Sequence, residues 1–197
     1  MNFVGEARPS TLADIEAVAA EIGVPTAAFR AVIQVEAGGK GYDKSKRPKA
    51  LFERHHFYKH LKNQPEKLEV AVREGLAYPK WGTAPYPKGS DAVYEEIERA
   101  CAIDVEAALL STSWGLPQIM GSNYRMAGCS SVEEMVEESM ESEANQLRQM
   151  ANFLKSAGLA DDLAALNWAA VARGYNGPEY AVNKYDTKLE EAYNTFV

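Results

Sequence analysis

Cysteine and histidine are both scarce in this chain, which has two cysteines and three histidines among 197 residues. Cys101 and Cys129 do not form a spacing typical of metal sites. A disulfide between them is possible on count alone, but two buried free thiols are the favoured interpretation in a reducing compartment. His55, His56 and His60 lie close together in the sequence, yet no cysteine or second histidine group completes a zinc site. We therefore expect neither a metal nor another cofactor.

Long apolar runs and clusters of basic residues are also missing. No stretch approaches the roughly 18 apolar residues of a membrane span, and the first residues have neither the basic nor the apolar region of a secretory signal. These absences predict a soluble protein made in the cytoplasm. The net charge of −7, without a basic stripe, argues against nucleic acid as a partner. An anionic substrate would be repelled unless close contacts or salt overcame the repulsion.

Helical patterning runs along nearly the whole chain. With 46% hydrophobic residues the protein can bury a core, and apolar residues recur at helical spacing without an internal repeat or a linker. We predict one mainly α-helical domain over residues 1–197, with at most a small β element. The apolar triplet at 50–52 fits either a strand or the start of a helix. Residues 63–90, rich in proline, are predicted to be the least regular part and to form a surface lobe or the wall of a cleft.

Glu36 ends an apolar helical run and stands just before the glycines at 38 and 39. Aliphatic neighbours and the negative end of the helix dipole both disfavour a charged carboxylate, so we expect the pKa of Glu36 to be raised. A carboxylic acid that stays protonated near neutral pH is the general acid that glycoside hydrolysis requires. Most glutamates in last turns are simply solvated, however, so this segment alone does not establish catalysis.

Three short segments that combine glycine, aromatic and hydrogen-bonding residues interrupt the helical pattern, at 36–39, 113–121 and 175–180. Glycine is common in turns, so each segment alone is weak evidence. Sugar-binding sites need flat apolar faces for pyranose rings together with amide or hydroxyl groups for the sugar substituents. For Trp114, a place in the core is an equally good interpretation. The candidate substrate-binding residues are Ser113, Trp114, Gln118, Tyr124, Tyr175 and Asn176.

Five motifs follow one another along the chain, at residues 35–39, 47–55, 113–121, 167–168 and 172–177. They include Val-Glu-Ala-Gly-Gly, Leu-Phe-Glu-Arg-His, Ser-Trp-Gly-Leu-Pro-Gln-Ile-Met-Gly, Asn-Trp and Arg-Gly-Tyr-Asn-Gly. In these motifs the sequence resembles the N-acetylmuramidase family of phage endolysins, within the lysozyme-like superfamily, over almost its whole length. Ala37, Pro117 and Gly174 stand where family members often carry other residues, which bears on local geometry more than on chemistry.

The resemblance implies a lysozyme-like, two-lobed helical fold with a cleft between the lobes. Glu36 matches the catalytic acid of the superfamily, and Glu53 matches a second glutamate of the family. From the residues alone, Glu53 is better explained as an ordinary ion-paired glutamate. If Glu53 faces Glu36 across the cleft, nearby cationic groups would keep Glu53 ionised while Glu36 stays protonated. Glu36 would then be the acid, and Glu53 either a base or a nucleophile. A carboxyl separation of about 5–5.5 Å would indicate a nucleophile, and about 6.5–9.5 Å a base that activates water. The resemblance to goose-type relatives, which invert, favours the base that activates water.

The resemblance also implies a function, namely hydrolysis of the β-1,4 bond between N-acetylmuramic acid and N-acetylglucosamine in peptidoglycan. Such an endolysin is expected to be a monomer that waits in the host cytoplasm until a separate membrane-permeabilising protein gives it access to periplasmic peptidoglycan, and then to cause lysis. Two alternatives stay open. A lytic transglycosylase would use the same acid but form 1,6-anhydro ends, and a non-catalytic module would only bind peptidoglycan.

Overall fold

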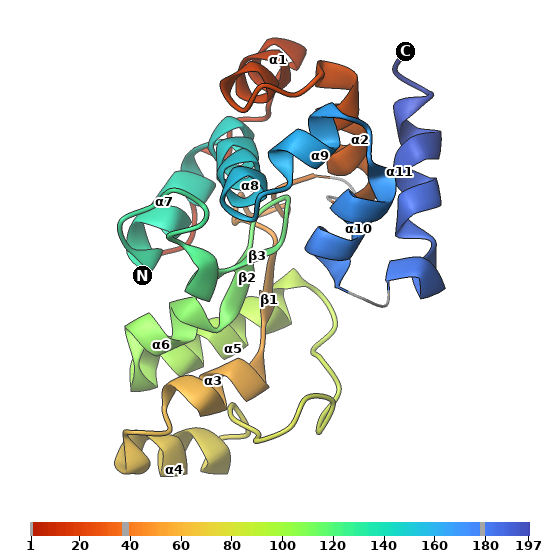
Figure 1. The fold of residues 1–197 in the computed structure, drawn as a ribbon. Helices are drawn as coiled ribbons and strands as arrows, with labels where there is room; N and C mark the ends of the chain where they lie inside the picture. Colours follow the sequence, from red (N-terminus) through yellow and green to blue (C-terminus); the bar gives the residue numbers. More distant parts are fainter. Residues whose placement is uncertain (1, 37–39, 178–179) are drawn as a thin grey trace.

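The computed structural model describes residues 2–36, 40–177 and 180–197, and most of these lie in helices (Figure 1). The α-helices are α1 (Leu12–Glu21), α2 (Thr26–Glu36), α3 (Arg54–His60), α4 (Pro65–Arg73), α5 (Ser90–Ile103), α6 (Val105–Leu110), α7 (Val132–Glu141), α8 (Glu143–Ser156), α9 (Ala160–Ala164), α10 (Trp168–Asn176) and α11 (Tyr185–Tyr193). The 3₁₀ helices are η1 (Gly121–Asn123) and η2 (Tyr180–Asn183), and the strands are β1 (Ala50–Phe52), β2 (Thr112–Trp114) and β3 (Ile119–Met120). The predicted mainly α-helical fold with a small β element is confirmed.

The first two helices form a sharply bent pair. Thr11 caps α1 reciprocally, because its hydroxyl accepts from the Asp14 N–H at 3.2 Å and the Asp14 carboxylate accepts from the Thr11 N–H at 2.8 Å. The axes of α1 and α2 then meet at 109°. No single helix in the described part of the chain is long and apolar enough to cross a membrane, and α1 with α2 passes that test only as this bent pair.

The three strands form one antiparallel sheet in the order β1-β2-β3. Phe52 lies opposite Thr112, Ala50 lies opposite Trp114, and Ser113 lies opposite Met120. The apolar triplet at 50–52 is therefore a strand and not the start of a helix. This strand matters for the site because Glu53 follows it directly and α3 begins at the next residue.

The buried side chains fall into two clusters, which correspond to the two expected lobes. The first cluster gathers side chains from the sheet and from α3, α5, α6 and α7, whereas the second gathers side chains from α1, α2 and α8 to α11. Figure 1 shows α3 and α4 beyond the lower end of the sheet, α1 and α2 at the upper end of the molecule, and α10 and α11 to the right of the strands. Representative members are Phe52, Phe57, Tyr94, Ile97 and Leu109 in the first cluster, and Phe29, Val32, Leu147, Met150 and Val171 in the second.

Residues 63–90, predicted to be the least regular part of the chain, contain one helix in their first half. Residues 65–73 form α4, and Pro65 occupies its first turn, where a missing N–H costs no hydrogen bond. The proline that suggested irregularity therefore starts a helix. Residues 74–89 contain neither helix nor strand, and we call residues 78–89 the aromatic loop because they carry Tyr78, Trp81 and Tyr86.

Both cysteines are free thiols, which matches the interpretation favoured from the sequence. Burial raises the pKa of Cys101 to about 11. Burial and the neighbouring Glu138 carboxylate raise the pKa of Cys129 to about 12. Because the thiolate is the reactive form, neither cysteine has the environment of a nucleophile.

Candidate active site

Glu36 is the last residue of α2, as predicted, and its side chain is partly buried. Phe29 and Val32 anchor the helix in the second core and so fix the position of its end. Burial, and to a lesser extent the negative charge of Glu36, raise the pKa of the Tyr175 hydroxyl, so the two residues interact electrostatically. The raised pKa expected for Glu36 itself stays a prediction. Residues 37–39, the remainder of the first polar segment, lie outside the described residues.

Tyr175 connects the end of α10 to the turn between β2 and β3. Its hydroxyl donates to the Pro117 carbonyl oxygen at 3.4 Å, and its ring meets Phe153 of α8 edge-on with centroids 5.8 Å apart. The raised pKa keeps this hydroxyl protonated at neutral pH, so it remains the donor to Pro117. The structure thus brings two predicted site residues together. Asn176 ends α10, but its side chain is outside the described part of the molecule, so its contact with substrate stays a prediction.

Glu53 occupies the N-cap position of α3, yet its carboxylate does not cap that helix. The backbone N–H of Glu53 donates to the Ser111 carbonyl oxygen at 2.8 Å, which ties the residue to the end of α6. The side chain is 16% exposed, and its Oε2 accepts a hydrogen bond of 2.5 Å from the Tyr86 hydroxyl. The Glu53 carboxylate therefore accepts a hydrogen bond from Tyr86 and does not cap the N-terminus of α3.

Arg54, the next residue in the sequence, has a different ion-pair partner, whereas His55 contacts the Glu53 carboxylate. His55 Nδ1 lies 3.3 Å from Glu53 Oε2. Arg54 instead forms an ion pair with Glu96 of α5 and donates to the Pro85 carbonyl oxygen at 3.0 Å. Arg54 therefore does not pair with Glu53. Burial and the hydrogen bond to Glu53 raise the pKa of Tyr86 to about 12, so this hydroxyl remains a donor at neutral pH.

Ser113 and Gln118 use their polar groups within the β2–β3 hairpin. The Ser113 hydroxyl donates to Gln118 Oε1 at 3.2 Å, and the Gln118 amide donates to the carbonyl oxygens of Gly115 at 2.8 Å and Lys49 at 3.1 Å. Gln118 has a positive φ of 51°, which these bonds hold in place. Both residues shape the turn that contacts Tyr175, and direct contact with substrate stays a prediction for them.

The prediction that Trp114 faces the substrate is wrong. Its side chain is fully buried, its indole N–H donates to the Leu109 carbonyl oxygen at 3.1 Å, and its ring stacks on Phe3 with centroids 5.6 Å apart. Trp114 belongs to the first core, and all three residues of β2 are buried, so this strand gives the indole no face toward solvent. The alternative that the sequence left open, a core tryptophan, is correct.

Tyr124 follows η1 and packs partly against the first core. Its hydroxyl accepts from Arg125 Nε at 3.0 Å. The Arg125 guanidinium also lies over the Tyr124 ring, 5.5 Å from its centroid. The contact of Tyr124 with substrate stays a prediction.

Two aromatic residues near Glu53, Trp81 and Tyr86, were not among the predicted site residues. Tyr86 contacts the carboxylate directly, and Trp81 Nε1 donates to the Tyr86 hydroxyl at 3.1 Å. The available signal was the concentration of tyrosine and tryptophan in an otherwise irregular segment. Across the described residues, no group of three or more histidine, cysteine, aspartate or glutamate side chains is arranged to hold a metal ion.

Two helical cores around a small antiparallel sheet, with one glutamate at a helix end and a second after a strand, define a lysozyme-like protein. The chain belongs to the N-acetylmuramidase family, since the model of that family matches residues 25–197. Membership makes peptidoglycan the expected substrate. The structure is also similar to the crystal structure of the Burkholderia AP3 phage endolysin, with a TM-score of 0.87 and 36% sequence identity, over 96% of this chain and 72% of that one. A comparison with curated proteins found no match.

Proposed function

We propose that this chain is a phage endolysin that hydrolyses the β-1,4 bond between N-acetylmuramic acid and N-acetylglucosamine in peptidoglycan, and thereby lyses the host cell. In this proposal residues 1–197 act as one catalytic domain and as a monomer. The protein is held in the host cytoplasm until a separate protein permeabilises the membrane, and it then reaches the periplasmic peptidoglycan. Family membership and the similarity to a phage endolysin support the proposal.

The observation that carries the proposal is the position of Glu36. It ends α2 within the part of the chain matched by the family model, and Tyr175 lies beside it. A partly buried carboxyl group at the C-terminal end of a helix favours its protonated form. Such a group can donate a proton to the glycosidic oxygen as the bond breaks, which is the role of the general acid in glycoside hydrolysis.

Glu53 is the proposed second carboxylate. Tyr86 and His55 both contact Oε2, whereas Oε1 has no hydrogen bond to any of the described residues. A carboxylate held by one oxygen keeps a fixed orientation, and its other oxygen can accept a proton from water. We assign Glu53 the role of the base that activates the attacking water.

The first experiment compares Glu36→Gln with the wild type on purified peptidoglycan sacculi, measuring loss of turbidity and release of reducing ends. Glutamine keeps the shape of glutamate but cannot deliver a proton, so activity should fall by about 10²–10⁴-fold while the circular dichroism spectrum is unchanged. Glu21→Gln is the matched control, because Glu21 also ends a helix but is exposed and forms a surface ion pair with Arg148. This control should keep nearly full activity.

The non-catalytic alternative gives a different outcome in the same experiment. A binding module would leave the turbidity unchanged with the wild type as well as with the variant. A residual activity of more than about a tenth in Glu36→Gln would contradict the assignment of Glu36 as the acid.

A further inference from the structure

Trp81 is 70% exposed, whereas the equally large Trp114 is fully buried. A tryptophan left in water exposes a large apolar face, and single exposed apolar residues need no special explanation. Trp81 differs from such residues because its indole N–H is engaged in a hydrogen bond to Tyr86, which fixes the edge of the ring while its faces stay open. A fixed, exposed aromatic face is the surface on which the apolar side of a pyranose ring can stack.

A chain of hydrogen bonds connects this exposed ring to Glu53. An indole N–H can only donate, so the Tyr86 oxygen accepts from Trp81 at 3.1 Å and the Tyr86 proton is directed to Glu53 Oε2 at 2.5 Å. The bond to the carboxylate is charge-assisted and therefore the stronger of the two. The orientation of the Glu53 carboxylate thus depends on Tyr86, which in turn depends on the position of Trp81.

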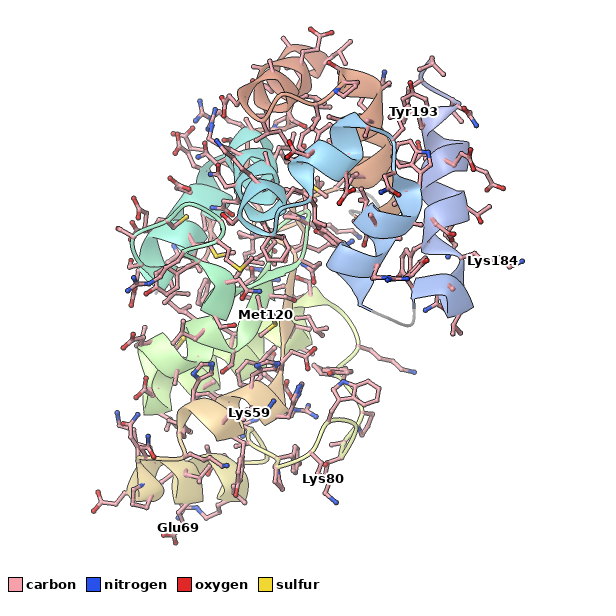
Figure 2. The ribbon with its side chains drawn as sticks, in the orientation of Figure 1. Lys59, Glu69, Lys80, Met120, Lys184 and Tyr193 are labelled. Carbon is pink, nitrogen blue, oxygen red and sulfur yellow. The ribbon has the colours of Figure 1, made fainter. Side chains whose placement is uncertain are left out.

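A small hollow of about 20 Å³ lies between the aromatic loop and the start of α3. Its lining includes Arg54, His55, Tyr78, Lys80, Thr83 and Tyr86 as well as Trp81. A sugar would therefore lie on its rim, against the exposed Trp81 ring, with hydroxyl groups of the lining nearby. Figure 2 shows Lys80 at the outer end of the loop, where its ammonium group can approach the carboxylates of peptidoglycan peptides.

Both halves of the aromatic loop are hydrogen-bonded to Arg54 of α3. In the first half, the Tyr78 N–H donates to the Arg54 carbonyl oxygen at 3.4 Å. The Thr83 hydroxyl closes the turn around Trp81 by donating to the Lys80 carbonyl oxygen at 2.8 Å, and Gly82 between them has a φ of +73° that favours glycine. In the second half, Arg54 donates to the Pro85 carbonyl oxygen and pairs with Glu96. Trp81 consequently sits on a fixed turn, and a ligand that stacks on it need not order the loop first.

We propose that Trp81 is the stacking platform of a pyranose-binding subsite beside Glu53, and that the Tyr86 hydroxyl connects this platform to the carboxylate. The subsite takes an N-acetylated aminosugar of the glycan strand. Its part in turnover rests on the proposed function, whereas its ability to bind sugar can be measured without any cleavage. Trp81 is then a substrate-binding residue, and Tyr86 is a positioning residue for Glu53.

The test uses isothermal titration calorimetry with chitotetraose, a β-1,4 oligomer of N-acetylglucosamine, on the full chain. Trp81→Ala removes the platform and should weaken binding at least tenfold, while Trp81→Phe keeps a stacking face and should bind within about threefold of the wild type. The melting temperature of both variants should stay close to that of the wild type, because Trp81 is mostly exposed. Equal affinity of wild type and Trp81→Ala would overturn the subsite. Val72→Ala, a change at another exposed apolar residue, serves as the control and should not alter binding.

The connection to Glu53 is tested by kinetics on peptidoglycan fragments. Tyr86→Phe keeps the ring but removes the hydroxyl, so kcat should fall about tenfold or more with KM nearly unchanged. Trp81→Phe should also lower kcat, because phenylalanine cannot donate to Tyr86, whereas Trp81→Ala should raise KM as well. Normal kcat in Tyr86→Phe would overturn the connection. If the wild type binds chitotetraose through Trp81 but cleaves nothing, the subsite stands and the proposed hydrolysis fails.

Discussion

At the scale of single residues, the two glutamates occupy different surroundings. Glu36 ends a helix on the second core, near Tyr175, which is partly buried. Glu53 follows a strand of the first core and accepts a hydrogen bond from Tyr86. The proposed division into an acid and a base requires two carboxyl groups in different surroundings of this kind.

The residue-scale prediction concerns Glu53→Gln. Glutamine can still accept the hydrogen bond from Tyr86, so the fold should be preserved, but it cannot take a proton from water. Activity on sacculi should fall by at least about two orders of magnitude, and one limb of the bell-shaped pH–activity profile should disappear.

Glu74→Gln is a suitable control for this variant, because Glu74 is exposed and pairs with Arg99 on the surface. Near-normal activity in Glu53→Gln would reduce Glu53 to a structural residue. It would also make the transglycosylase, which can work with a single acid, the better description.

At the scale of elements, the β2–β3 turn is held against α8 by one buried amide. Gln146 is fully buried, and its Oε1 accepts from the Leu116 N–H at 2.7 Å while its amide donates to the Ser139 carbonyl oxygen at 2.7 Å. The same turn carries Pro117, the acceptor for Tyr175. Gln146 therefore connects helix α8 to the turn that contacts a site residue.

We predict that Gln146→Ala lowers the free energy of unfolding by about 1–3 kcal/mol, because the buried Leu116 N–H loses its acceptor. Urea denaturation followed by circular dichroism measures this. Lys155→Ala, an exposed change on the same helix, should alter stability by less than about 0.5 kcal/mol. If the two variants were equally stable, water or a backbone shift would have to replace the lost acceptor.

The sequence and the structure agree best where local rules decide the outcome. Apolar residues at helical spacing predict a mainly helical chain, and Glu36 falls at the helix end where the pattern puts it. The sequence pattern could not show that Trp114 points into the core, because that depends on the strand's partners. The sequence pattern also could not predict the contact between Tyr86 and Glu53, because 33 residues separate them and an irregular loop brings them together.

At the scale of the whole molecule, charge should affect activity on the natural substrate. The chain has a net charge of −7, and peptidoglycan peptides carry carboxylates. Raising the ionic strength from about 0.01 M to 0.15 M shortens the screening length from roughly 30 Å to 8 Å. The rate on sacculi should therefore rise severalfold, while the affinity for uncharged chitotetraose should not change. A rate on sacculi that falls steadily with salt would show that local cationic groups such as Lys80 dominate binding.

The proposed reaction cleaves peptidoglycan by hydrolysis on the N-acetylmuramic acid side, with water as the nucleophile. Mass spectrometry of the soluble products, formed from sacculi in ¹⁸O-labelled water, is the decisive measurement. We expect fragments with a reducing N-acetylmuramic acid end that carries one ¹⁸O atom. Fragments ending in 1,6-anhydro-N-acetylmuramic acid without label, or in reducing N-acetylglucosamine, would contradict it.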